Sequence, residues 1–354
     1  MIGYKILHDE LVEYVYEYKE LLRQFRGSRF FVSGAGGMIG SYLIFLLIEA
    51  NKKLGLDINV VAVDRNAELL NRFSEMDEGN IVTCYNLDIC NDPLPDGKYD
   101  YVIHAASNTS PIDYATKPID TIWTNVFGAK TLMDMAVRRS AKRFLFCSSV
   151  EAYGRNNGDT DKFTELYSGY VDSNTVRAGY PASKRCVEAL CNAYASEYKN
   201  FDFIIARIGR FYGPTVVPGD TKAPSQFIGN AVRGEDIVLK SDGTQLFSWG
   251  YVGDCATALL TLLIKGERCE AYNVADPESC EMLKDFAQCV ADVANVKLSF
   301  VPQSQVESAA YSKITKATMD TSKLESLGWH AAHHLADGIF RTVHYIRQVQ
   351  KEVN

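Results

Sequence analysis

The sequence has 354 residues, of which 47% are hydrophobic and 23% charged, as in a globular chain with a large core in one or two closely joined domains. The formal net charge is −7 and no run of Lys and Arg occurs, which excludes a nucleic-acid partner. The nine cysteines lack C-x-x-C pairs and His partners at zinc spacing, so we expect reduced thiols, a cytoplasmic protein and no metal site. The N-terminus is too acidic for a signal peptide and the longest apolar run, 42–48, is too short to span a bilayer, so no membrane partner is expected.

Residues 1–27 predict a helical extension. Their apolar side chains recur at three- and four-residue spacing, as on one face of an amphipathic helix. The members of this face are Ile6, Leu7, Leu11, Val15, Tyr18, Leu21, Leu22 and Phe25. We expect the face to pack on the body of the protein or on a partner subunit.

A glycine-rich stretch follows the extension. An apolar segment leads into Gly34, Gly37 and Gly40 and a second apolar segment comes after them, which predicts a strand, a tight turn and the start of a helix. Such a turn lets the backbone approach a pyrophosphate, and the helix N-terminus offers it free N–H groups. The next predicted strand, 59–63, ends at Asp64, where an acid can hold the ribose hydroxyls of an adenosine. Together these features favour a dinucleotide site over an ordinary strand-to-helix turn.

Strands and helices alternate through the next part of the chain. The further strands expected are 81–86, 100–104, 143–147 and 203–207, and the long helices expected are 119–137 and 180–198. This alternation implies right-handed βαβ units, and therefore an α/β fold with a Rossmann-type doubly wound parallel sheet. We assign residues 28–210 to this dinucleotide-binding domain, with a surface excursion at 154–176.

The alternation loosens after this domain. Residues 210–214 predict a turn. The elements expected beyond it are short strands near 237–239 and 272–274 and helices at 225–233, from Asp254 and from Glu281. We expect residues 211–354 to form mainly a smaller α/β substrate-binding lobe that is interleaved with the first domain.

Tyr180 and Lys184 favour proton transfer. They lie four residues apart on a predicted helix and so project from the same face. A phenol has a pKa of about 10, and a nearby ammonium favours the phenolate and lowers that pKa. Ser149, at the end of a predicted strand, can hydrogen-bond the same reacting oxygen. The Tyr–Lys spacing also fits an exposed pair on a helix surface, but its combination with the glycine turn and Asp64 favours an active site.

The sequence resembles the extended branch of the short-chain dehydrogenase/reductase family, which contains the nucleotide-sugar epimerases, dehydratases and decarboxylases. The resemblance extends over residues 29–347. The matching segments are 33–40, Asp64, 88–89, 104–107, 125–128, 148–154, 180–184 with Glu188, 213–214, 251–254, 272–274, 320–323 and 327–329.

This resemblance implies a tightly held NAD. The residues implied to bind it are Gly34, Gly37, Met38, Ile39, Gly40, Asp64, Arg65, Asp88, Ile89, Ala105, Ala106, Ser107, Asn125, Tyr180 and Lys184. Asp64 would hold the adenosine ribose, Asp88 and Ile89 would lie beside the adenine, and Lys184 would hold the nicotinamide ribose. A carboxylate repels a 2′-phosphate, so Asp64 predicts a preference for NAD over NADP, with Arg65 as the opposing charge.

The catalytic residues implied are Ser149, Glu151, Tyr180 and Lys184, with Tyr180 as the base. Residues 149–154 are similar to the Thr-Ser-Glu or Thr-Asp-Glu and Val-Tyr-Gly of UDP-glucuronate decarboxylases and dTDP-glucose dehydratases. In those enzymes the glutamate supports chemistry after the 4-keto sugar forms. Val150 stands where dehydratases carry an aspartate, which favours decarboxylation or epimerisation over dehydration. The alternative for Glu151 is a capping or ion-pairing carboxylate.

The substrate contacts expected are Ser107, Arg210, Ser225 and Phe247. Family members usually carry an arginine at the position of Phe247, where it grips the diphosphate, and an asparagine at the position of Arg210. We predict that Arg210 carries the substrate phosphate that Phe247 cannot. Two alternatives remain: the substrate is not a standard sugar diphosphate, or Arg210 is structural and pairs with a carboxylate.

The function expected is an NAD-dependent enzyme that oxidises C4 of a nucleotide sugar, transforms the 4-keto intermediate by epimerisation, decarboxylation or dehydration, and reduces it again. One alternative is an NAD(P)H-dependent reductase of a sugar or sugar-phosphate carbonyl. The other is a non-enzymatic dinucleotide-sensing protein, which the presence of Ser149, Tyr180 and Lys184 disfavours. The N-terminal helix and the long helices suggest a homodimer, as the family usually forms.

Overall fold

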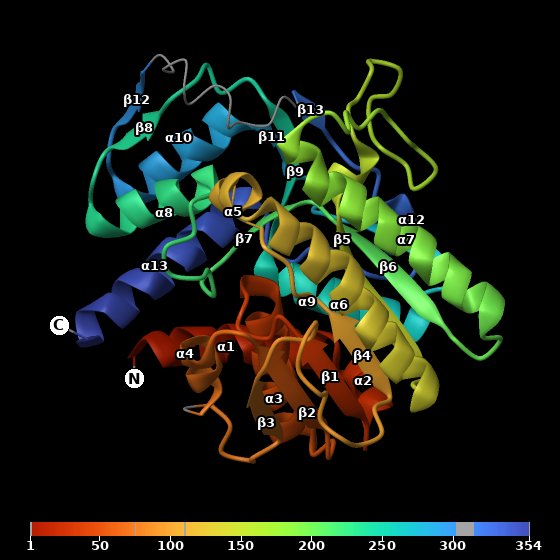
Figure 1. Cartoon of the computed structure of the whole chain (residues 1–354). Helices are drawn as coiled ribbons and strands as arrows, with labels where there is room; N and C mark the ends of the chain where they lie inside the picture. Colours follow the sequence, from red (N-terminus) through yellow and green to blue (C-terminus); the bar gives the residue numbers. More distant parts are fainter. Residues whose placement is uncertain (1, 75, 110, 302–314, 354) are drawn as a thin grey trace.

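A seven-stranded parallel sheet forms the centre of the molecule (Figure 1). The computed structural model describes residues 2–74, 76–109, 111–301 and 315–353. The strand order is β10-β6-β5-β4-β1-β2-β3. The strands are β1 Arg29–Ser33, β2 Asn59–Asp64, β3 Val82–Asn86, β4 Tyr101–His104, β5 Arg143–Ser149, β6 Phe203–Ile208 and β10 Glu270–Val274. The order reverses between β1 and β4, and open parallel sheets bind ligands outside the carboxyl ends of the strands at such a point.

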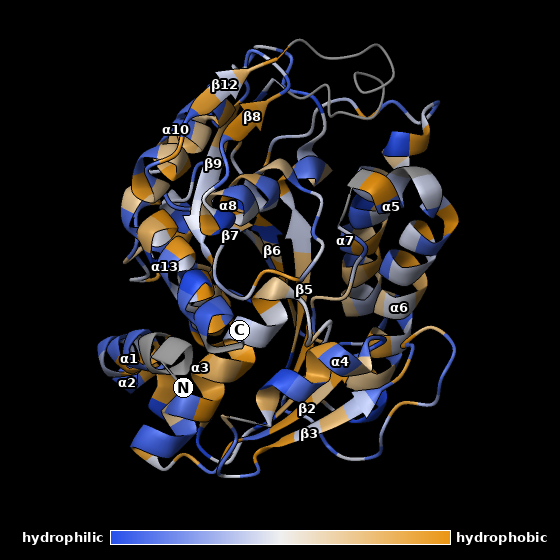
Figure 2. Ribbon diagram, turned by 90° about the vertical axis from the view of Figure 1, so that its left-hand side faces the viewer, coloured by the Kyte–Doolittle hydropathy of each residue, from blue (hydrophilic) through white to orange (hydrophobic). Residues whose placement is uncertain are grey.

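Helices cover both faces of this sheet. The helices on one face are α1 Ile2–Glu17, α2 Lys19–Leu22, α3 Met38–Leu54 and α9 Val252–Lys265, and those on the other are α6 Pro118–Arg138 and α7 Gly179–Glu197. Each side has its own core, with Leu46 and Leu259 buried on the first and Leu132 and Val187 on the second. Figure 2 shows hydrophobic residues along strands such as β2, with polar residues on the outer sides of the helices. The predicted α/β, Rossmann-type doubly wound fold is confirmed.

A smaller lobe packs beside the sheet around a third core that includes Phe227, Trp249 and Phe286. Its strands are β7 Arg210–Tyr212, β8 Ile237–Leu239, β9 Leu246–Tyr251, β11 Cys280–Met282, β12 Leu298–Phe300 and β13 Lys316–Ala317. Its helices are α8 Ala223–Arg233, α10 Leu283–Ala294 and α13 Leu335–Val353. The short elements elsewhere are α4 Ala67–Leu70, α5 Pro111–Thr116, α12 Ser322–Glu325, and the 3-10 helices η1 Arg23–Phe25, η2 Asn71–Phe73, η3 Val150–Tyr153 and η4 Val176–Ala178.

The predicted turn at 210–214 is wrong at its start, because Arg210–Tyr212 forms β7 and pairs in parallel with β9. Two aromatic residues in this segment suit a strand, whereas the following Gly-Pro pair suggested a turn. Gly209 lets the chain pass from β6 into the second sheet, because a Cβ there would lie 3.1 Å from the Ser248 carbonyl oxygen. The helix expected from Glu281 begins instead at Leu283.

The chain also returns from the smaller lobe to the large sheet. α9 packs against α3, and β10 forms the edge strand beside β6. Residues 252–274 therefore lie with the Rossmann body although they follow the first strands of the smaller lobe.

The N-terminal extension packs on the body. α1 lies against α3, α9 and α13, and its Leu11 is fully buried. The Glu10 carboxylate is 3% exposed and accepts hydrogen bonds from the hydroxyls of Tyr42 and Tyr251. Arg341 of α13 donates to the same carboxylate at 3.3 Å. One buried acid thus joins α1 to α3, β9 and α13.

In the described part of the chain, no helix is long and apolar enough to cross a membrane. All nine cysteines are free thiols. Among the described residues, no group of three or more His, Cys, Asp and Glu side chains is arranged to hold a metal ion.

Candidate active site

The glycine turn between β1 and α3 forms a backbone cradle. Gly34 has φ +71°, and a Cβ at this position would lie 2.5 Å from the Ala106 nitrogen, so only glycine fits. A Cβ at Gly40 would overlap the carbonyl oxygen of Gly34. Gly37 caps α3, which begins at Met38, so the first N–H groups of a long helix face the turn without helical partners. This geometry fits a dinucleotide pyrophosphate.

Asp64 lies beside this turn at the carboxyl end of β2. Its Oδ2 accepts a hydrogen bond from the Gly36 N–H at 3.0 Å, and its Oδ1 accepts one from the Asn66 N–H at 3.0 Å. Arg65 donates to Asp120 of α6 at 3.1 Å and to Asn108, in the segment after β4, at 3.2 Å. The carboxylate therefore remains at the turn, while the neighbouring cation is held by another acid.

The residues expected around the adenine lie after β3. The Asp88 carboxylate accepts hydrogen bonds from the Cys90 N–H and the Asn91 side chain, both at 2.9 Å. Ile89 is 5% exposed and packs against Gly128 of α6. Asp88 thus fixes the loop, and Ile89 anchors it to the helical layer.

Small residues follow β4, as expected for an open ligand-binding edge. Ala105 and Ala106 lie against Gly34, and the Ser107 hydroxyl donates to the Asn108 carbonyl at 3.1 Å. Asn125 of α6 is fully buried and donates to the Ser183 hydroxyl at 2.8 Å.

Two buried polar side-chain atoms near the end of β4 and on α6 have no hydrogen-bond partner among the described residues. They are Asn125 Oδ1 and His104 Nε2. Burial, then the charge of Lys184, lowers the pKa of His104 to about 3, so the imidazole is neutral at physiological pH.

Tyr180 and Lys184 share a face of α7, as predicted, and both are buried. The Lys184 Nζ donates to the Cys147 carbonyl of β5 at 2.8 Å and lies 5.6 Å from the centre of the Tyr180 ring. Burial lowers the pKa of Lys184 to about 8. The end of β5 and the start of α7 thereby bring Tyr180 and Lys184 to the carboxyl edge of the sheet.

The electrostatics of Tyr180 differ from the sequence-based expectation. Burial, then the Glu151 carboxylate, raises the pKa of Tyr180 to about 12. The main groups that lower this pKa are Ser149 by a hydrogen bond, Arg177 by its charge and Tyr114 by a hydrogen bond. The cation that chiefly favours the phenolate is thus Arg177, whereas Lys184 donates to a backbone carbonyl.

Glu151 lies in η3, the 3-10 helix that begins directly after Ser149. The Ser149 hydroxyl accepts a hydrogen bond from the Glu151 N–H at 3.2 Å. The Glu151 carboxylate pairs with Arg177 at 2.7 Å. Arg177 stacks over the Tyr114 ring at 4.4 Å, and the Tyr114 and Tyr180 ring centres are 4.8 Å apart.

Sequence reasoning missed Arg177 and Tyr114. Arg177 precedes Tyr180 by three residues at the start of the same helical run, and this spacing was the available signal for it. Tyr114 lies on the short helix α5, distant in sequence from every motif, so no local pattern pointed to it.

The expected substrate residues lie on the smaller lobe or at its boundary. Arg210 begins β7 and its guanidinium lies 3.8 Å from the centre of the Phe247 ring. Ser225, in the first turn of α8, donates its hydroxyl to Asp220 at 3.0 Å. The structure therefore brings Arg210 and Phe247 together, whereas Ser225 is bonded within its own lobe.

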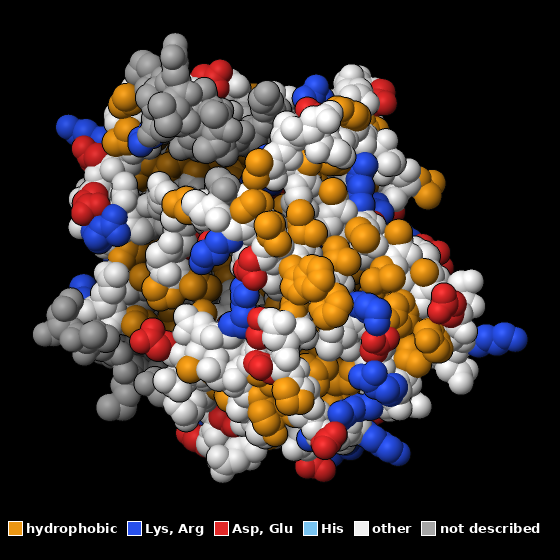
Figure 3. All heavy atoms as spheres, viewed as in Figure 1, with side chains coloured by type: hydrophobic (Ala, Val, Ile, Leu, Met, Phe, Trp, Pro, Cys, Tyr) orange, Lys and Arg blue, Asp and Glu red, His pale blue; other side chains and the backbone are white. Residues whose placement is uncertain are grey.

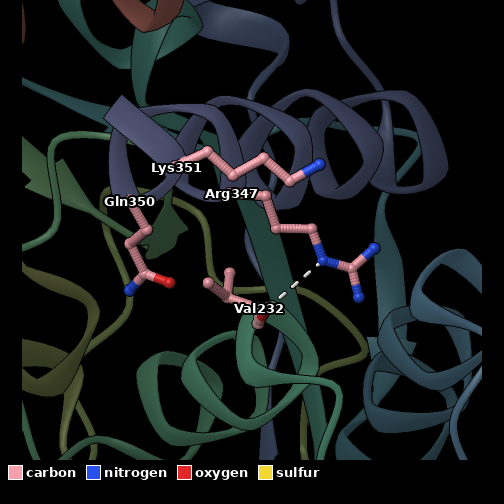
Figure 4. Close-up of a pocket in the computed structure, with 4 residues that line it drawn as sticks. All are labelled: Val232, Arg347, Gln350 and Lys351. Atoms are coloured by element: carbon pink, nitrogen blue, oxygen red, sulfur yellow. Dashed lines mark hydrogen bonds between the residues drawn. The ribbon is translucent and has the colours of Figure 1, made fainter. Parts of the chain in front are cut away.

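A pocket on the smaller lobe is lined by Val232, Arg347, Gln350 and Lys351 (Figure 4). Arg347 donates to the carbonyls of Val232 at 3.4 Å and Ala231 at 2.6 Å, near the last turn of α8. Its guanidinium stabilises a helix end, and none of the predicted site residues lines this pocket.

Comparisons with known proteins agree with this geometry. The model of the NAD dependent epimerase/dehydratase family matches residues 30–275. The chain belongs to this family. Family members depend on NAD, and the glycine cradle and Asp64 of this chain fit that cofactor.

Two curated relatives in this family are UDP-glucuronic acid decarboxylases. The chain is 30% identical to UDP-glucuronic acid decarboxylase 4 of Arabidopsis thaliana over 332 residues, which cover 90% of this chain and 69% of that protein. It is 27% identical to UDP-glucuronic acid decarboxylase 1 of Xenopus tropicalis over 326 residues, covering 90% and 72% of the two chains. An epimerase from Methanothermobacter thermautotrophicus has the same fold, with a TM-score of 0.79, 18% identity and coverage of 94% of this chain and 96% of that one.

Proposed function

We propose that this member of the NAD-dependent epimerase/dehydratase family acts on a nucleotide sugar by oxidation at C4, and that its reaction is the decarboxylation of a UDP-uronic acid. The observation that carries the proposal is Glu151, ion-paired to Arg177 and electrostatically coupled to the catalytic tyrosine. The Arg177 guanidinium beside Tyr180 suits a substrate that carries its own acid. The relatives named as UDP-glucuronic acid decarboxylases support the same reaction.

The glycine cradle and Asp64 would hold NAD, and the bound cofactor would supply the hydride acceptor that oxidation at C4 requires. Tyr180 takes the proton of the C4 hydroxyl, and Ser149 hydrogen-bonds the same oxygen. Arg177 favours the phenolate form of Tyr180, while Glu151 opposes it. Once C4 is a ketone, the C5–C6 bond breaks, CO₂ leaves and the electron pair moves into an enolate stabilised by the C4 oxygen. C5 then takes a proton from solvent water, and Tyr180 returns its proton to the C4 oxygen as the ketone is reduced.

The test is to incubate the purified protein with UDP-glucuronate and NAD and to follow the products by nuclear magnetic resonance. Decarboxylation gives CO₂ and a UDP-pentose without net change in NADH. A UDP-hexuronate with inverted C4 and no CO₂ would identify an epimerase instead. In a parallel incubation with NADH in place of NAD, stoichiometric consumption of NADH would identify a reductase. NAD binding without turnover of any UDP-sugar would support a sensor.

We also propose that the protein is a homodimer that pairs through α6. Four apolar side chains are exposed along one side of this helix: Ile119, Ile122, Trp123 and Phe127. Figure 3 shows hydrophobic side chains gathered over α6, and the Trp123 and Phe127 rings stack at 4.7 Å. Such a patch suits an equivalent patch on a second copy. Light scattering should give twice the chain mass, and Trp123→Glu should give the monomer mass without loss of fold.

The nine free thiols lead us to propose a reducing compartment such as the cytoplasm. Thiol labelling of denatured protein taken directly from cells should modify every cysteine. Cysteines protected from labelling until a reductant is added would contradict this location.

A further inference from the structure

Two guanidinium groups at the site have buried N–H groups that donate no hydrogen bond to any described residue. In the described part of the chain, Arg210 Nε and Arg177 Nη1 are buried and have no hydrogen-bond partner. Leaving a buried charged donor unpaired is costly, so such atoms need an explanation in a native structure.

The position of Arg210 is fixed by the sheet of the smaller lobe. β7 pairs with β9 so that Arg210 lies opposite Trp249. Phe247 is two residues earlier on β9 and therefore on the same face of the sheet. The guanidinium carbon lies over this ring, 3.8 Å from its centre, and Phe247 itself is 5% exposed. The ring holds the face of the cation and leaves its edge, where the N–H groups are, available.

The charges around this edge do not balance. Glu151 is bonded to Arg177 at 2.7 Å, and it also interacts with Arg210 over a longer distance. Burial lowers the pKa of Arg210, and repulsion by the charge of Arg177 lowers it further. Two cations therefore share one carboxylate beside Tyr180, and a second anion would relieve the imbalance. Figure 3 shows the surface hollowed between the smaller lobe and the α5–α6 side.

We propose that Arg210, seated on Phe247, and Arg177 together bind an oxyanion of the substrate. This inference rests on the proposed function and names the group that the site recognises. The shared chemistry is a pair of negatively charged oxygens on one centre, which the sugar carboxylate and the diphosphate both supply. The Phe247 platform makes Arg210 a specificity-determining residue for an acidic ligand.

The test compares Arg210→Met, which keeps an apolar contact on Phe247, with the surface control Arg233→Ala. Calorimetry on the NAD-loaded protein measures the affinities for UDP, UDP-glucose and UDP-glucuronate. If the carboxylate is bound, Arg210→Met weakens UDP-glucuronate by ten- to a hundredfold and leaves UDP-glucose unchanged. If the diphosphate is bound, all three ligands weaken by similar factors. Arg233→Ala changes none of them.

Unchanged affinity for all three ligands in a folded Arg210→Met protein overturns the inference. The proposed function fails separately, if the wild type binds none of the UDP ligands. In that case inorganic pyrophosphate and malonate are added to the NAD-loaded wild type and variant, and the melting temperature is measured. Stabilisation by either anion that disappears in Arg210→Met supports the oxyanion site, and equal behaviour of the two proteins overturns it.

Discussion

At the cofactor end of the proposed site, the charged side chains are bonded to protein groups. At the proposed sugar end, two arginines retain buried N–H groups that have no hydrogen-bond partner among the described residues. Asp64 accepts from two backbone N–H groups, and Arg65 is held by Asp120 and Asn108. Arg177 and Arg210 share the single carboxylate of Glu151. The cofactor end is thus preorganised by the protein, and the sugar end has an electrostatic demand that a ligand must satisfy.

Tyr180 lies where the two ends meet, and its loss should have the largest effect. We expect Tyr180→Phe to lower turnover by about 10²- to 10⁴-fold, because the proposed proton-transfer oxygen is lost while the ring remains packed against Tyr114. Steady-state kinetics measures the loss, and calorimetry should find nearly unchanged NAD affinity. Tyr114→Phe is the control and should retain turnover within about tenfold. A Tyr180→Phe protein with most of its turnover would remove this residue from the mechanism.

At the cofactor end, Gly34→Ala should disrupt the cradle. The new Cβ would lie 2.5 Å from the Ala106 nitrogen at φ +71°, so the turn must move. We expect NAD affinity to fall by about 10- to 100-fold in calorimetry, with UDP-sugar affinity less affected.

Gly27→Ala is a matched control for that change. Gly27 has φ +69° and nothing within 4 Å of its Cβ position, so it has the backbone strain without the clash. It should lose stability by about 1–2 kcal/mol and keep its NAD affinity. Equal NAD affinities for the two alanine variants would show that close approach at Gly34 is unimportant.

At the sugar end, Glu151→Gln should shift a titration. The Glu151 carboxylate raises the pKa of Tyr180, so its replacement by a neutral amide of the same shape should lower that pKa. The phenolate then forms at lower pH. Ultraviolet difference spectroscopy as a function of pH should detect the lower pKa of Tyr180. The Tyr180→Phe protein is the reference, because it lacks this phenol. A higher pKa of Tyr180 would contradict this prediction. It would mean that Arg177, released from Glu151, has moved away from Tyr180.

The smallest effect is expected from Asp120→Asn, which loosens Arg65 at the cofactor end. Arg65 would lose its ion pair at 3.1 Å and become available to a 2′-phosphate. Because this pair is exposed, we expect only about a three- to tenfold rise in the NADP-to-NAD affinity ratio. Lys130→Ala, on an exposed pair of the same helix, is the control. An unchanged ratio would mean that Asp64 alone excludes NADP.

The sequence predicted the fold and the cofactor end because their signals are local. The glycine turn, Asp64 and the Tyr180–Lys184 pair each lie within one strand, turn or helix, whose periodicity reveals their common face. Tyr114 and the stacking of Arg210 on Phe247 depend on tertiary contacts between distant segments, which no local pattern contains. Likewise the return of β10 to the large sheet could not be inferred from a strand pattern that fits either lobe.

The order in which the chain is synthesised decides when each hydrogen bond of Glu10 can form. α1 leaves the ribosome well before α13, because Glu10 and Arg341 are separated by 331 residues. At typical rates of synthesis this interval is roughly 15–70 s. During it Glu10 has Tyr42 within reach, but Tyr251 and Arg341 arrive much later. The contacts that hold the N-terminal helix are therefore completed only after α13 has been made, and until then the apolar face of this helix is a natural target for chaperones.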